Sequence, residues 1–130
     1  MIDIPTLFIL GAGASKPYGF PTGRELRTQI IRSFPSDYKT LQSTDISLKL
    51  DSLKRQELAM VSDFVEHFSK SPVYSIDQFL AFNPAFSYQG KMAIAYYIRT
   101  KEIESKFWEE PPSEEDWYSL LFNRMIYSFA

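Results

Sequence analysis

Two glycines and a serine follow directly after a run of apolar residues near the start of the chain. The run, Leu7 to Leu10, predicts a buried strand, and Gly11, Gly13 and Ser15 come where that strand would turn into a helix. Unpaired backbone N–H groups and the positive end of a helix dipole meet at such a corner, which suits a diphosphate. Glycine lets the phosphate approach because a Cβ would hold it away from the main chain. The pattern therefore predicts a site for a phosphate-bearing ligand.

The glycine pattern by itself is also found in strand-turn-helix corners that bind nothing. The dehydrogenase fingerprint G-x-G-x-x-G would need a glycine at position 16, where this chain has Lys16. A P-loop needs Gly-Lys-Ser/Thr after four spacer residues, whereas here Lys16 follows Ser15. An ordinary dehydrogenase, a GTPase and a P-loop kinase are therefore excluded, and a turn without a ligand remains the alternative.

A second motif makes the pattern more specific. Residues 19–24 are Gly-Phe-Pro-Thr-Gly-Arg, and they follow Gly-Ala-Gly-Ala-Ser at 11–15 after three residues. The pair resembles the sirtuin motifs GAG-[IA]-S and G-[IF]-P-x-x-R at the same spacing. With Glu-Leu after the arginine, it looks closest to the sirtuin-like NAD hydrolases of bacterial anti-phage defence proteins. Residues 75–80 and the Asp-Trp-Tyr at 116–118 are similar to that group less specifically.

The resemblance implies an α/β fold of the Rossmann-like sirtuin type, which in this segment would be mostly helical with one clear N-terminal strand. Residues 1–130 would be the N-terminal part of an NAD-binding domain, with the strand and phosphate cradle in 5–34 and a helical insert in 51–129. NAD would be the substrate or ligand, without a metal. The residues that the resemblance places at NAD are Gly11, Ala12, Gly13, Ser15, Phe20, Pro21, Arg24 and Asp77.

Two of these residues also have local explanations. Arg24 comes in the first turn of a helix expected to begin at Thr22, where the dipole does not favour a cation. Its partner is therefore either a nucleotide phosphate or a nearby acid such as Glu25. Asp77 follows Ser75 in the first turn of a short helix, where a carboxylate suits the dipole even without a ligand.

The implied reaction is cleavage of the bond between nicotinamide and ribose in NAD. In the family an asparagine positions a water or hydroxyl and a histidine acts as general base, and both come later than this segment. The one histidine here, His67, lies beside an apolar stripe and is expected to be a packing residue. We therefore expect no catalytic residue in 1–130 and no hydrolysis by it alone. The alternative is a module that binds or senses NAD or ADP-ribose without cleaving it.

Composition limits the remaining classes. The 130 residues are 45% hydrophobic, which is enough for one domain with a packed core. Because cysteine is absent, the four-cysteine zinc module of deacylating sirtuins has no ligands here, and hydrolysis is favoured over deacylation. A net charge of -2 predicts no binding to nucleic acid or membrane surfaces. The expected location is the cytoplasm, and the expected partners are the remainder of a larger chain and, as an option, further copies in a homo-oligomer.

The rest of the chain predicts helices that position this corner. The first runs from about residue 22 to 33 with Leu26, Ile30 and Phe34 on the core face, and it ends at Pro35. Amphipathic patterns predict further helices over 51–69, after Ser75, over 89–108 and over 114–129. The apolar stripe expected in the first of these consists of Leu53, Met60, Val61, Phe64 and Phe68. Ser75 is expected to cap the short helix that follows it, and Asn83-Pro84 to form a cap followed by proline at the first helical position. Residues 12–21 are expected to form a stiff loop, since they include Pro17 and Pro21.

Overall fold

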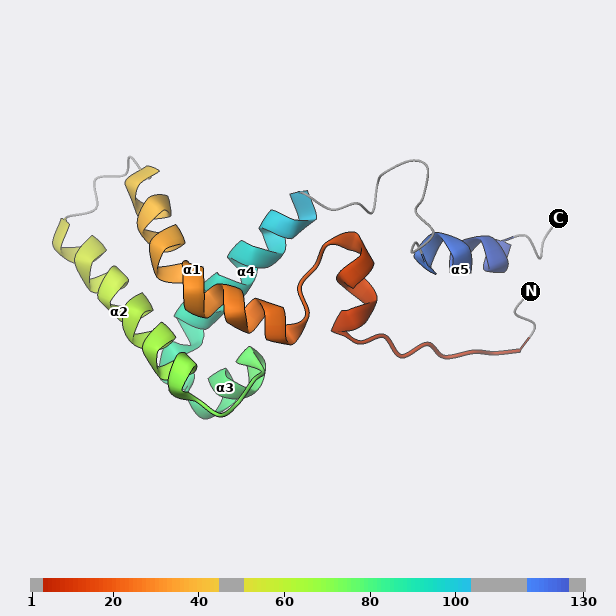
Figure 1. Ribbon diagram of the computed structural model, residues 1–130, viewed down its shortest axis with the longest axis horizontal. Helices are drawn as coiled ribbons and strands as arrows, with labels where there is room; N and C mark the ends of the chain where they lie inside the picture. The colour runs from red at the N-terminus through yellow and green to blue at the C-terminus, as the bar shows by residue number, and fades with distance from the viewer. Residues whose placement is uncertain (1–3, 45–50, 104–116, 127–130) are drawn as a thin grey trace. The chain divides into compact units, whose positions relative to one another are not determined.

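The computed structural model describes residues 4–44, 51–103 and 117–126, and every regular element in these ranges is a helix (Figure 1). The chain divides into two compact units, one of residues 1–22 with 100–130 and one of residues 23–99. The elements in chain order are the 3-10 helix η1 (Ala12–Tyr18), α1 (Gly23–Thr44), α2 (Asp51–Lys70), α3 (Ile76–Phe82), the 3-10 helix η2 (Pro84–Phe86), α4 (Ser87–Ile103) and α5 (Trp117–Ile126).

The predicted N-terminal strand is not formed. The side chains of residues 7–10 remain exposed, with exposed fractions of 86% for Leu7 and 89% for Ile9. A strand is stable only when its N–H and C=O groups pair with a neighbouring strand, and the described ranges contain no strand that could do so. The prediction of an α/β, Rossmann-like fold with a clear N-terminal strand is therefore wrong, because the described part of the chain is helical.

The unit of residues 23–99 is built on α1 and α2, which pack side by side (Figure 1). Ile30 and Phe34 of α1 and Phe64 of α2 have no exposed surface. The Phe64 ring is surrounded by the rings of four other phenylalanines, at centroid separations of 5.9 to 6.4 Å. The core of this unit therefore contains a cluster of aromatic rings packed together with aliphatic side chains.

The apolar face was predicted correctly for α1 and only in part for α2. Leu26, Ile30 and Phe34 are all buried, as their four-residue spacing predicted. In α2 the predicted stripe includes Leu53 and Met60, whose side chains are 47% and 51% exposed. The helical period was right, but the buried face is narrower than the apolar stripe in the sequence.

Helix α1 is longer than predicted because it continues through Pro35 to Thr44. Proline in a helix interior removes one backbone hydrogen bond and tends to bend the helix, and Figure 1 shows α1 bending part-way along its length. The flanking residues Phe34 and Tyr38 are both buried in the core. Burial of side chains on both sides of the proline stabilises the helix across it.

The helices that follow α2 begin close to where the sequence predicts, but their side-chain caps are not formed as predicted. Ser75 precedes α3 as predicted, but its side chain makes no capping hydrogen bond. Asn83 and Pro84 open η2, in agreement with the expectation of a cap followed by proline. Helix α4 buries Ala93 and Tyr97. The expected end of that helix near residue 108, and the start of the last one at 114, lie outside the described residues.

Two tyrosines of this unit donate hydrogen bonds to carboxylates. The Tyr38 hydroxyl donates to Glu57 Oε2 at 3.1 Å, and the Tyr97 hydroxyl donates to Asp37 Oδ2 at 2.7 Å. Burial, followed by the hydrogen bond to Glu57, raises the pKa of Tyr38 to about 12. Burial and the Asp37 carboxylate raise the pKa of Tyr97 as well. Both side chains are therefore held in the neutral form by the fold.

These raised pKa values predict a loss of stability in alkali. The unfolded chain releases tyrosine protons near pH 10, whereas the folded protein retains them, so stability falls as pH rises above about 10. The expected slope is about 1.4 kcal/mol per pH unit for each tyrosine, up to its folded pKa. Urea unfolding of wild-type protein and Tyr97→Phe from pH 8 to 11 measures this slope. The variant should show a shallower slope than wild type, and equal slopes in the two proteins would contradict the assignment.

Candidate functional site

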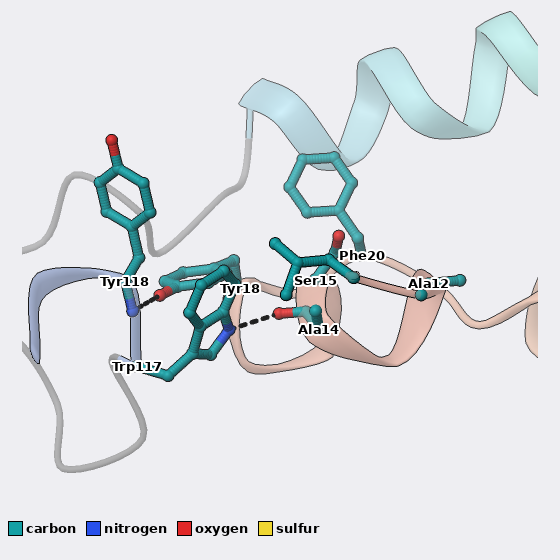
Figure 2. A pocket seen from close by; sticks show the side chains of 9 residues that line it. Ala12, Ala14, Ser15, Tyr18, Phe20, Trp117 and Tyr118 are labelled. Carbon is teal, nitrogen blue, oxygen red and sulfur yellow. Dashed lines mark hydrogen bonds between the residues drawn. The ribbon is translucent and has the colours of Figure 1, made fainter. Parts of the chain in front are cut away.

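A pocket with a volume of 510 Å³ lies within the unit formed by residues 1–22 and 100–130 (Figure 2). Its walls are residues 10–12, 14, 15, 18 and 20, together with the first two residues of α5. The volume falls within the range of sites that hold small molecules. Four of the residues predicted to contact NAD, Gly11, Ala12, Ser15 and Phe20, line this one pocket.

The floor of the pocket is η1, which occupies the stretch predicted to be a loop. Gly11 has an extended backbone and precedes the helix, and its carbonyl accepts a hydrogen bond from the Ala14 N–H at 3.0 Å. At the other end Gly19 has a φ of 88°, in the left-handed region that favours glycine. Its N–H donates to the Lys16 carbonyl at 3.0 Å, and the Phe20 N–H donates to the Ser15 carbonyl at 3.3 Å. The left-handed glycine thus turns the chain so that Phe20 returns to the same pocket as Ser15.

The opposite wall comes from the start of α5. Trp117 Nε1 donates a hydrogen bond to the Ala14 carbonyl at 2.7 Å, and the Tyr118 N–H donates to the Tyr18 hydroxyl at 3.0 Å. Figure 2 shows these two contacts joining α5 to η1. The Tyr18 and Trp117 rings also meet edge to face, with centroids 6.3 Å apart. Segments about a hundred residues apart in the sequence therefore form one aromatic-walled site.

The two glycines of the first motif are not required by the fold. A Cβ built on Gly11 or on Gly13 would meet no atom within 4 Å, and neither residue has a positive φ. At Gly11, which lines the pocket, an added side chain would extend into open space. Packing and backbone conformation therefore do not explain the choice of glycine here, whereas close approach of a ligand would.

The remaining predicted residues are not in the pocket lining. Gly13 and Pro21 belong to the same unit as the pocket but do not line it. Arg24 and Asp77 belong to the unit of residues 23–99. The guanidinium carbon of Arg24 lies 5.5 Å from the centre of the Tyr74 ring, a cation–π contact that the sequence analysis did not consider. Asp77 is exposed in the first turn of α3, where its charge suits the dipole.

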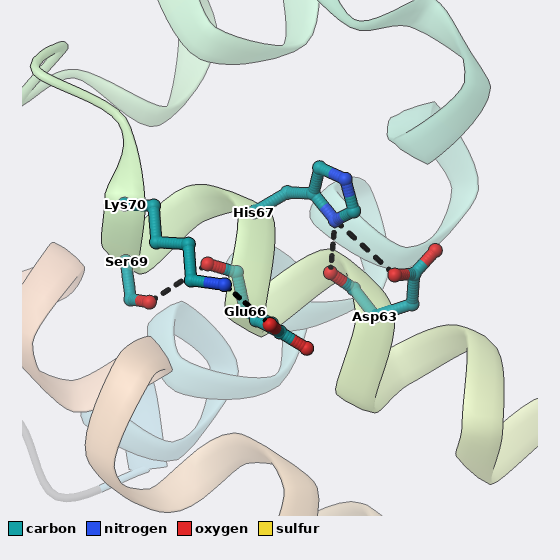
Figure 3. Close-up of polar contacts among 5 residues, drawn as sticks. All are labelled: Asp63, Glu66, His67, Ser69 and Lys70. Atoms are coloured by element: carbon teal, nitrogen blue, oxygen red, sulfur yellow. Dashed lines mark hydrogen bonds and ion pairs between the residues drawn. The ribbon is translucent and has the colours of Figure 1, made fainter.

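The histidine of the sequence is engaged within its own helix (Figure 3). His67 Nδ1 lies 2.9 Å from the Asp63 carbonyl oxygen and 3.2 Å from Asp63 Oδ1. Its ring is 5.1 Å from that of Phe86. Nearby, the exposed Lys70 ammonium donates a hydrogen bond to the Glu66 carboxylate. This hydrogen bond lowers the pKa of the Glu66 carboxyl. The His67 side chain is 56% exposed on this charged helix face, so the predicted packing role is limited to the ring contact with Phe86.

Sequence reasoning did not assign Tyr18, Trp117 or Tyr118 to the site. Tyr18 lies between the two motifs, and this position was the one signal in the sequence that places it near the site. Trp117 and Tyr118 belong to the Asp-Trp-Tyr stretch noted for its family resemblance. Their place in the pocket depends on contacts with η1, which residue spacing does not specify.

The described residues contain no group of three or more histidine or acidic side chains that could hold a metal ion. None of the helices in the same residues combines the length and the apolar character needed to cross a bilayer. No family model, curated protein or solved structure matches this chain. The pocket and the motifs that line it are therefore the features that support a function.

Proposed function

We propose that this chain binds NAD in the pocket between η1 and the start of α5, as the holding part of an enzyme that cleaves the nicotinamide–ribose bond. The proposal is supported chiefly by the convergence of Gly11, Ala12, Ser15 and Phe20 on that pocket. These residues come from both halves of the motif pair that resembles sirtuin-like NAD hydrolases. A fixed ligand position would contribute to catalysis by orienting the ribose for attack.

The glycine at position 11 provides a second line of support. It faces the pocket, and the protein itself leaves space for a side chain there. A ligand that touches the main chain would account for that space. Consistent with the resemblance, we also propose a cytoplasmic role in anti-phage defence, in which NAD is consumed, with the catalytic asparagine and histidine supplied by the remainder of a larger chain and with a homo-oligomer as a further option.

Binding of NAD or ADP-ribose without cleavage is the second candidate. It is favoured by the pocket lining, which contains no histidine, since the one histidine of the sequence, His67, lies on α2. Under either function residues 1–130 should bind NAD and release no nicotinamide. Measurable turnover by the purified segment would contradict this expectation and would show that it contains its own catalytic groups.

Calorimetry with NAD on a pair of matched glycine variants tests the site. Gly11→Val places a branched side chain in the pocket and should weaken binding at least about tenfold, a loss of about 1.4 kcal/mol. Gly13→Val makes the same change two residues away, outside the lining, and should bind as wild type does. A Cβ at either position meets no atom within 4 Å, and neither glycine has a positive φ, so we expect both variants to fold.

The remaining outcomes of this experiment each exclude part of the proposal. Equal loss in both variants would assign the ligand to the whole glycine turn instead of to the pocket. Equal heats in wild type and both variants would show that NAD binds elsewhere. The absence of heat in wild type would contradict NAD binding by this chain.

A further inference from the structure

The chemistry of the pocket walls differs from that of a diphosphate site. None of the described residues that line it carries a charged side chain. A diphosphate is usually held by lysine or arginine together with several backbone N–H groups. Here the largest wall groups are the rings of Tyr18, Phe20, Trp117 and Tyr118. Aromatic faces are better suited to a flat ring than to a dianion.

The backbone at the floor of the pocket supports the same conclusion. Part of its donor capacity is already used, since the Ala14 N–H donates to the Gly11 carbonyl and the Phe20 N–H to the Ser15 carbonyl. The helix η1 is only seven residues long, so its dipole is small compared with that of a long α-helix. The diphosphate expected at this turn would therefore find little compensating charge in the pocket.

The aromatic wall is held in a fixed orientation by its polar atoms. Trp117 Nε1 is bonded to the Ala14 carbonyl and the Tyr118 N–H to the Tyr18 hydroxyl. The indole N–H is thereby satisfied by the protein, which leaves the carbon surface of the ring for a ligand. Neighbouring rings meet Trp117 at interplanar angles of 64° and 79°. Such a wall is preorganised, so a ring that binds against it need not order these side chains.

We infer that the pocket is a site for the flat nitrogen heterocycle of the nucleotide and that Trp117 of α5 contacts that ring. The inference rests on the proposed function for the identity of the ligand. The Ser15 hydroxyl lies in the same lining and offers a hydrogen-bond partner for a polar substituent of the ring. The diphosphate then lies outside the pocket, and the first residues of α5 become part of the binding site.

Tryptophan fluorescence tests for contact between the ligand and Trp117. The sequence contains two tryptophans, so Trp108→Phe leaves Trp117 as the reporter. Nicotinamide mononucleotide, AMP and inorganic pyrophosphate are titrated separately into this variant. The inference predicts saturable quenching by at least one of the two ring-bearing nucleotides and none by pyrophosphate. The nucleotide that quenches more strongly identifies which end of NAD enters.

Affinity measurements on α5 variants complete the test. Loss of one stacking ring in Trp117→Leu should raise the Kd for the quenching nucleotide about tenfold. Trp117→Phe retains an aromatic face and should lose less. Leu120→Ala is the control, because Leu120 lies on the same helix, is 61% exposed and does not line the pocket. Its Kd should equal that of wild type.

The possible failures of this inference and of the proposed function are distinguishable. NAD binding by calorimetry with no Trp117 quenching and an unchanged Kd in Trp117→Leu would overturn the ring site and leave NAD binding in place. Quenching by pyrophosphate would also overturn it. If nicotinamide mononucleotide or AMP quenches the Trp117 fluorescence while NAD itself gives no binding heat, the ring site stands and the proposed function is contradicted. No response to any probe would overturn both.

Discussion

Replacement of Phe64 by alanine should lower the free energy of unfolding by about 3–5 kcal/mol. Phe64 has no exposed surface, and its ring contacts those of Phe34, Phe68, Phe79 and Phe86. The change removes the transfer free energy of a buried ring and leaves a cavity that rigid neighbouring rings fill poorly. Because whole domains are stable by only about 5–15 kcal/mol, the variant should be partly unfolded at 37 °C.

Phe82→Ala is the matched control for this change. Phe82 is also a phenylalanine of the unit of residues 23–99, but its side chain is 74% exposed. Its removal should change stability by no more than about 0.5 kcal/mol. Urea unfolding followed by circular dichroism measures both variants. Similar midpoints for Phe64→Ala and Phe82→Ala would contradict the ring cluster as the core of this unit.

The helices of this unit could be predicted because their signals are local. The spacing of Leu26, Ile30 and Phe34 alone specifies a helical face, and all three are buried. The same local logic failed at Pro35, where proline predicts an end but burial of Phe34 and Tyr38 holds the helix together. Whether a proline ends a helix is decided by the packing on both sides of it, which is a non-local property.

The N-terminal strand failed for a related reason. The apolar run at residues 7–10 satisfies every local requirement of a buried strand. Strand formation also requires a partner with matching backbone groups, and no periodicity within the run can provide one. The described chain offers no such partner, so the α/β fold class, with the strand expected at this run, was wrong although the helices after it were predicted well.

The candidate site was predictable only on the side that carries the motifs. Gly11, Ala12, Ser15 and Phe20 could be selected from the two glycine motifs, and all four line the pocket. The facing wall comes from Trp117 and Tyr118, which reach η1 through two hydrogen bonds. A contact over a hundred residues leaves no trace in local spacing. Sequence motifs thus located one side of the pocket, and the structure added the side that determines its aromatic character.

Replacement of Arg27 by alanine should lower the free energy of unfolding by about 2–4 kcal/mol. Its guanidinium donates to the carbonyls of Phe68, Ser71 and Val73, and it lies 4.5 Å from the Phe68 ring centre. These carbonyls end α2 and begin the segment that follows it, where the regular helical hydrogen bonds stop. The Phe68 carbonyl also accepts a hydrogen bond from the Ser71 N–H at 3.2 Å. A cation at a helix C-terminus is also favoured by the dipole. Arg27 therefore fastens the end of α2 to α1.

Arg27→Lys and Arg24→Ala separate this role from a simple loss of charge. Lysine keeps the charge, but its single ammonium group cannot replace the planar guanidinium, which donates to several carbonyls at once. Arg27→Lys should therefore recover less than half of the stability lost in Arg27→Ala. Arg24 lies on the same helix, is exposed and contacts the Tyr74 ring, so its removal should cost less than about 1 kcal/mol. Hydrogen exchange supplies the local readout, since Arg27→Ala should speed exchange at the end of α2 more than in the middle of α1. Full stability in Arg27→Lys, or an equal loss of stability in Arg24→Ala, would show that a positive charge is enough to explain the effect and that the guanidinium geometry does not matter.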